Sequence, residues 1–175
     1  ELDDFLVNLL PKLNANGEID EIIKQGERTA SGCEKLNVLS REEAMAATRD
    51  LSMIASSLRR HGIGMEKIPA VETALVKLGQ TTKEIPADTV FSYGTRNPEG
   101  KRVRTFTRHA EERLFIDSFR RGMRELPLAV RALDIAQDLS VTEPRYSAML
   151  FTARERFTQM ISAIKASAEY VFKLS

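Results

Sequence analysis

The C-terminal part of the chain carries the pattern that most constrains the fold. Apolar residues recur there at spacings of three and four in one continuous stretch, at Leu150, Ala153, Phe157, Met160, Ile164, Ala168 and Val171. This is the period of one face of an α-helix, whereas a strand places every second residue on a face. No period-2 run of β-branched residues occurs elsewhere, and glycine (9) and proline (6) are scarce. The sequence therefore predicts an all-α fold.

A second helix is marked at both of its ends. The sequence Ser40-Arg-Glu-Glu43 is a capping box, which predicts a helix start. The sequence Arg59-Arg-His-Gly62 combines cations with a glycine, which is typical of a helix end. Between these signals one apolar stripe is formed by Ala44, Ala47, Leu51, Ile54 and Leu58.

The remaining helices are predicted from shorter patterns, which gives a helical bundle of six to seven helices in all. Their expected ranges are 2–10, stopped by Pro11, then 18–28, 69 to about 77, 109–123, a helix that begins at Pro127, and the last from about Pro144. The expected inner face of the 69–77 helix is Val71, Ala74, Leu75 and Leu78. That of the 109–123 helix is Leu114, Phe115, Ser118, Phe119 and Gly122.

Residues 79–108 break the helical pattern. They contain Pro86, Gly94, Pro98 and Gly100, and a loop of this length is usually functional or disordered. We expect it to be partly packed through its apolar residues, Val90, Phe91, Tyr93, Val103 and Phe106. The overall prediction is a single helical domain over 1–175 with one long irregular loop at 79–108. Because the chain starts with Glu1 and closes on an apolar run, we expect it to be part of a longer chain.

The composition excludes several classes of protein. The 26 basic and 25 acidic residues leave a net charge of +1, which does not favour nucleic-acid binding. A single cysteine, Cys33, excludes an internal disulfide and a Cys-rich metal site, so we interpret it as a small filler residue. No apolar stretch is long enough to span a membrane, and the acidic N-terminus is not typical of a secretory signal. We expect a cytoplasmic protein with no membrane or nucleic-acid partner.

The loop contains a strongly basic segment, residues 96–108, with five cations and one acid. In an extended chain Arg102, Arg104 and Phe106 would lie on one side, and arginine forks suit carboxylate and phosphate groups. The segment is therefore a candidate site for a cofactor carboxylate, a phosphate or an amino-acid substrate. The alternative is a solvated cationic loop, because exposed ion pairs contribute little.

The two histidines leave room for one histidine-centred site. His109 is expected at a helix start, where the positive end of the helix dipole favours the neutral imidazole. A neutral imidazole can accept a proton or ligate a metal, although a polar surface position is the alternative. No second His or Cys lies three or four residues away, so no multi-ligand metal motif is present. His61 is explained by the helix end in which it lies.

Three short stretches then occur in a characteristic order: Leu9-Leu-Pro-Lys-Leu-Asn14, residues 49–62 and residues 97–107, followed by Glu111 or Glu112 and Phe115-Ile116. In this order they resemble the monodechloroaminopyrrolnitrin synthase family, distant relatives of tryptophan and indoleamine dioxygenases. The resemblance covers most of the chain. It implies that the helices form part of the indoleamine-dioxygenase-like fold.

The resemblance also implies a cofactor and site residues. The family binds haem b and uses it for oxygen-dependent chemistry on tryptophan-like substrates. His109 would be the catalytic distal histidine, although the stretch from His109 to Ile116 is one residue longer than the dioxygenase motif and Arg108 stands where the family tends to have glycine. The chain itself would supply no metal ligand, because the axial histidine is expected outside it. The residues that would contact the cofactor are Arg102, Arg104, Thr107 and Phe157.

Two functional hypotheses follow. The first is a haem-dependent oxygenase that acts on a small aromatic amino acid or indole derivative and takes dioxygen as its second substrate. The second is a non-enzymatic helical module that binds a protein partner or an anionic ligand through residues 96–108. The helix that begins at Pro127 has two apolar faces, and a homodimer is one arrangement that would cover them.

Overall fold

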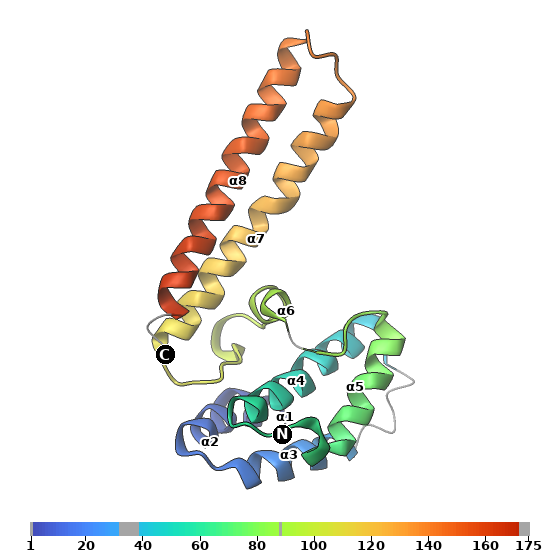
Figure 1. The fold of residues 1–175 in the computed structure, drawn as a ribbon, viewed down its shortest axis with the longest axis vertical. Coiled ribbons are helices and arrows are strands. Elements are labelled where there is room, and N and C mark those ends of the chain that lie inside the picture. Colours follow the sequence, from blue (N-terminus) through green and yellow to red (C-terminus); the bar gives the residue numbers. More distant parts are fainter. Residues whose placement is uncertain (1, 32–38, 88, 172–175) are drawn as a thin grey trace. The chain divides into compact units, whose positions relative to one another are not determined.

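The computed structural model describes residues 2–31, 39–87 and 89–171 (Figure 1). Every regular element in these ranges is helical, so the all-α prediction is confirmed. The structure divides into two compact units, Glu1–Arg108 (unit 1) and His109–Ser175 (unit 2), and the single helical domain expected over 1–175 stays a prediction. Cys33 and residues 172–175 at the end of the chain lie outside the described residues. No helix in the described ranges is long and apolar enough to cross a membrane.

Unit 1 starts with a helical run that contains a π turn. Helix α1 (Leu2–Asp4) leads into the π turn η1 (Phe5–Leu9), and α2 (Leu10–Asn16) follows. The predicted stop at Pro11 is wrong, because Pro11 lies in the first turn of α2. A proline costs little there, since the N–H groups of a first turn have no partner within their helix. The run ends at Gly17, whose φ of +67° lies in the left-handed region that glycine favours.

The core of unit 1 is built by α3 (Ile19–Ser31), α4 (Arg41–Arg60) and α5 (Pro69–Thr82), which pack against one another (Figure 1). At Gly26 of α3 a Cβ atom would lie 3.0 Å from Cγ2 of Ile54, so α3 and α4 approach closely at this point. The predicted inner face of α5 is confirmed. In the predicted stripe of α4 all residues are buried except Ala47, which is half-buried. Burial of these side chains is the main favourable contribution to folding of the unit.

Both predicted ends of α4 are confirmed. The Ser40 hydroxyl accepts the Glu43 N–H at 3.2 Å, and the Glu43 carboxylate accepts the Ser40 N–H at 2.8 Å. At the other end, the N–H groups of Gly62 and Ile63 donate to the carbonyls of Arg59 and Leu58. This is a Schellman arrangement, and it is closed by Gly62 at a φ of +74°. Helix α4 therefore begins and ends where its local chemistry predicts.

The predicted loop at 79–108 is shorter and more ordered than expected. Helix α5 continues to Thr82, and the short helix α6 (Val90–Thr95) lies within the range, capped by reciprocal hydrogen bonds between Thr89 and Ser92. A single 3-10 turn, η4 (Gly100–Arg102), follows, and another, η3 (Met65–Lys67), lies between α4 and α5. Tyr93 is buried with its ring 5.2 Å from that of Phe106. The loop is therefore partly packed, as predicted, although the side chains of Val90 and Phe91 are exposed.

Unit 2 is a hairpin of two long helices, α7 (Ala110–Gln137) and α8 (Pro144–Val171), which pack along their length (Figure 1). The start of α8 at Pro144 is confirmed. The predicted break at Pro127 is wrong, since α7 continues through it. The proline removes one hydrogen bond from the helix, and packing against α8 offsets this loss.

Small residues let the two helices of the hairpin approach closely. A Cβ atom at Gly122 would lie 3.1 Å from the Met160 carbonyl oxygen and 3.2 Å from Cβ of Ala163. The predicted inner face is therefore partly wrong: Ser118 and Gly122 are buried, but Leu114 is 46% exposed. The other small residues buried in the hairpin are Ala129, Ala132, Ala136, Ala153 and Ser167. Helical periodicity identifies an apolar stripe, but it does not identify which side of the helix faces a partner.

Candidate functional site

The basic segment of unit 1 is held by an asparagine–backbone clasp. The Asn97 amide oxygen accepts the Arg104 N–H at 2.8 Å, and the Asn97 amide nitrogen donates to the Arg104 carbonyl at 2.7 Å. Asn97 is buried, so these bonds satisfy its polar atoms away from water. The clasp closes the turn that contains η4 and fixes the position from which the Arg104 side chain leaves the backbone.

Arg104 is buried, with only 2% of its surface exposed. Its Nε lies 3.1 Å from Oδ1 of Asp50 and its Nη2 lies 3.2 Å from Oδ2, so the two groups form a bidentate pair. Its Nη1 donates to the Arg102 carbonyl at 2.8 Å. Asp50 comes from the middle of α4 and also accepts a 2.7 Å hydrogen bond from Nε of Arg49. A buried charge is tolerated when it is paired and hydrogen-bonded in this way.

Arg102 and Arg104 both reach the carboxylate of Asp3. Oδ1 of Asp3 lies 2.7 Å from Nη2 of Arg104 and 2.9 Å from Nη2 of Arg102. Nε of Arg102 lies 3.2 Å from both oxygens. Hydrogen bonding from Arg102, aided by the charge of Arg104, holds the pKa of Asp3 below its usual range. We call the two guanidinium groups, Arg102 and Arg104, the arginine cradle.

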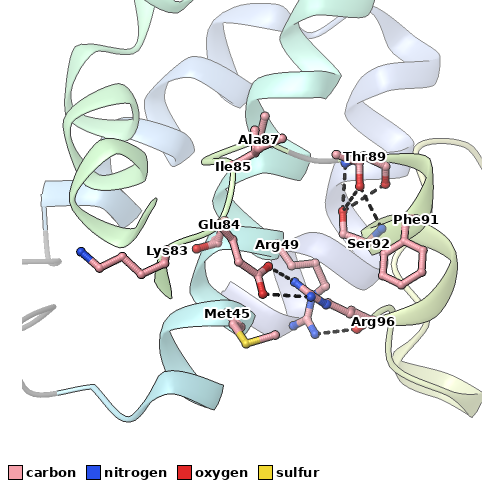
Figure 2. Close-up of a pocket in the computed structure, with 11 residues that line it drawn as sticks. Met45, Arg49, Lys83, Glu84, Ile85, Ala87, Thr89, Phe91, Ser92 and Arg96 are labelled. Carbon is pink, nitrogen blue, oxygen red and sulfur yellow. Dashed lines mark hydrogen bonds and ion pairs between the residues drawn. The ribbon is translucent and has the colours of Figure 1, made fainter. Parts of the chain in front are cut away.

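A pocket of about 310 Å³ lies on another side of the same basic segment, between α4, α6 and the residues after α5 (Figure 2). Glu84 and Arg96 form a bidentate ion pair across it, and Nη1 of Arg49 donates to the Arg96 carbonyl at 3.0 Å. The Arg96 guanidinium lowers the pKa of Glu84 by hydrogen bonding to it. Met45 and Phe91 supply apolar surface, and no histidine or cysteine is among the lining residues.

His61 belongs to a hydrogen-bonded cluster at the end of α4. Its Nε2 lies 3.2 Å from Oδ1 of Asn14, which also accepts the Ser57 hydroxyl. The Asn14 amide nitrogen donates to the Phe106 carbonyl at 3.0 Å. The cluster ties α2 and the basic segment to α4, which agrees with the helix-end role expected of His61.

The predicted site residues are divided between the two units. Arg102, Arg104 and Thr107 belong to unit 1, where Thr107 is half-buried. His109 and Phe157 belong to unit 2: His109 is exposed at the N-cap of α7, where its side chain makes no capping bond, and Phe157 is half-buried on α8. Within unit 1 the structure brings Arg102 and Arg104 together on one carboxylate.

Three residues of the site were missed by the sequence reasoning: Asp3, Asp50 and Asn97. The sequence could have indicated the role of Asp50, because this acid is next to Leu51 and borders the apolar stripe of α4. An acid at such a position is expected to be buried, and a buried acid is usually paired with a cation. Its partner lies 54 residues away and Asp3 lies 101 residues from Arg104. No local pattern connects residues over such separations.

Comparison with known protein families decides what kind of protein this is. Residues 19–173 match the family described as monodechloroaminopyrrolnitrin synthase PrnB. The chain belongs to this family. The match covers most of the 175 residues and confirms the resemblance on which the expectation of haem chemistry depends. PrnB-family proteins are haem-dependent oxygenases that act on a tryptophan-derived substrate.

The family implies a haem, so we asked whether the described residues fit one. Among them, no group of three or more His, Cys, Asp and Glu side chains gathers in a way that would hold a metal ion. The ring of His61 is engaged with Asn14, and the unit 1 pocket contains no histidine. Within the described part of unit 1, the single histidine is therefore engaged, and no residue there is assigned as the axial ligand that haem iron needs. A haem or substrate carboxylate that bound Nε or Nη2 of Arg104 would displace Asp3 or Asp50.

Proposed function

We propose that this chain acts in a haem-dependent oxygenase whose substrate is a small aromatic amino acid or indole derivative and whose second substrate is dioxygen. The observation that carries the proposal is the family match over residues 19–173. The proposed cofactor is haem b, and the proposed location is the cytoplasm. The axial ligand is proposed to come from a residue other than His61 and His109.

The proposed roles of the basic segment follow from its geometry. The side chain of Arg102 is 66% exposed, so it can exchange Asp3 for another carboxylate. Arg104 is proposed to contact the same carboxylate through Nη2, while its Nη1 holds the Arg102 carbonyl and its Nε holds Asp50. Thr107 and Phe157 are proposed to lie beside the bound cofactor.

His109 is proposed as the catalytic proton acceptor. It lies at the N-cap of α7 and is exposed, so its ring is accessible to a ligand. An imidazole ring can accept a proton or a hydrogen bond from an indole N–H through one of its nitrogens.

Two measurements on the full-length protein test the proposal. Protein expressed with added haem precursor is expected to show a Soret band, and a colourless protein would overturn the proposal. His109→Ala is expected to keep the Soret band and to lower turnover of an indole-bearing amino acid by about a hundredfold or more, the size of a general acid–base contribution.

The matched control is His61→Gln, which keeps a side-chain N–H for Asn14. This variant is expected to turn over substrate at the rate of the unchanged protein. If the His109 and His61 variants behave alike, His109 has no catalytic role.

A further inference from the structure

The arginine cradle is prepared to hold a carboxylate independently of Asp3. Asp50 binds two nitrogens of Arg104, and the Arg102 carbonyl binds a third. Arg104 itself is 2% exposed. Asp50 and the Arg102 carbonyl therefore set the orientation of the N–H that points to Asp3, and such preorganisation reduces the cost of binding a ligand.

The charges around the cradle favour an added anion. The Asp50 carboxylate is paired with two guanidinium groups, those of Arg49 and Arg104, and the Arg102 guanidinium, which forms an ion pair with Asp3, adds a third positive charge. Arg102 and Arg104 place three N–H donors within 3.2 Å of Oδ1 of Asp3. Charge-assisted bonds of this kind are about twice as strong as neutral ones.

Of the two carboxylates that bind Arg104 in the described part of the chain, Asp3 is the more exposed. Its side chain is 45% exposed, compared with 10% for that of Asp50. It is carried by α1, which continues directly into η1 and α2. A carboxylate of the same chain competes with free ligands through its effective concentration at the site.

We propose that the arginine cradle is a binding site for the carboxylate of a small molecule, and that Asp3 occupies it as an internal ligand that must leave before the small molecule binds. Asp3 thereby acts as an autoinhibitory contact. The inference deepens the role proposed above for Arg102 and Arg104, but its test measures binding of propionate and not the Soret band or turnover, so failure of the inference and failure of the oxygenase proposal can be told apart.

The test compares Asp3→Asn with Asp4→Asn in the full chain. Both variants remove one negative charge from α1, but Asp4 accepts a hydrogen bond from Asn8 and not from the cradle. Propionate is titrated while the Nε–H resonance of Arg102 is followed by NMR. Asp3→Asn is expected to bind propionate at least tenfold more tightly than either the unchanged protein or Asp4→Asn. Equal affinities in the two variants would overturn the proposal.

Two further titrations test which side chain and which class of anion are involved. The double variant Asp3→Asn/Arg102→Gln changes an exposed side chain and is expected to lose the tighter binding of propionate seen in Asp3→Asn. Because the Arg102 Nε–H is absent from this variant, binding is followed through the backbone amides of residues 97–104. Propionate binding as tight as that of Asp3→Asn overturns the assignment to Arg102. Inorganic phosphate is expected to bind Asp3→Asn more weakly than propionate does, because Asp50 repels a second negative charge. Phosphate binding as tight as that of propionate would overturn the assignment to a carboxylate. Unchanged amide resonances of α4 show that each variant is folded.

Discussion

The substitution Asp50→Asn tests whether the buried pair organises unit 1. Asparagine keeps the size of the side chain but removes its charge. It also replaces one of the two oxygens that face the guanidinium by an NH2 group, which cannot accept a hydrogen bond from it. Arg49, 15% exposed in its side chain, would then lose the carboxylate that it binds, and Arg104, 2% exposed, would keep only the half-exposed Asp3 as an anionic partner. Removing one member of a buried pair costs about 3–5 kcal/mol. Since domains are stable by only about 5–15 kcal/mol, this change should remove about a fifth or more of the stability of unit 1.

Urea unfolding combined with amide hydrogen exchange in α4 measures this loss, because α4 lies within unit 1 and the exchange of its amides reports that unit. The matched control is Asp3→Asn, which removes an acid from the same network at a half-exposed position. It should have little effect, since exposed ion pairs contribute little. If the two variants are equally stable, the Asp50 pair does not organise the unit, and the reasoning from burial is wrong.

Three other outcomes are expected. Gly122→Val should destabilise the α7–α8 hairpin by about 1–3 kcal/mol, because its Cβ alone would lie 3.1 Å from the Met160 carbonyl oxygen; thermal unfolding by circular dichroism measures this, and an unchanged melting temperature would contradict it. Arg96 lowers the pKa of Glu84 in the folded state below its ordinary 4.5, so this pair stabilises the protein above that pH and the stability is lost as the pH falls through the folded-state pKa; urea midpoints at pH 7 and pH 3 should therefore differ less in Glu84→Gln than in the unchanged protein. Ser40→Ala should cost about 1 kcal/mol through loss of the cap, visible as faster amide exchange in the first turn of α4.

The parts of the fold that the sequence predicted correctly are those that local chemistry controls. The capping box at Ser40 and Glu43 and the glycine at Gly62 involve residues within a few positions of one another, so their spacing alone identifies both ends of α4. Two of the predictions that failed concern prolines. Pro11 is compatible with a helix because it lies in the first turn of α2, and where that turn begins depends on where the preceding π turn ends. Pro127 is compatible with a helix because α7 packs along α8, which is a tertiary contact that the sequence does not show.

By itself the sequence determined the all-α class, the capped helices, the concentration of cations at 96–108 and the resemblance to the PrnB family. Helical periods, caps and short motifs act over a few residues, so they can be recognised along the chain. Only the tertiary structure decided that Arg104 is buried against Asp50 and that Asp3 shares its guanidinium, across separations of 54 and 101 residues. The physical reason is that an arginine fork binds any carboxylate with suitable geometry, and the packing of α4 against the basic segment selects which one.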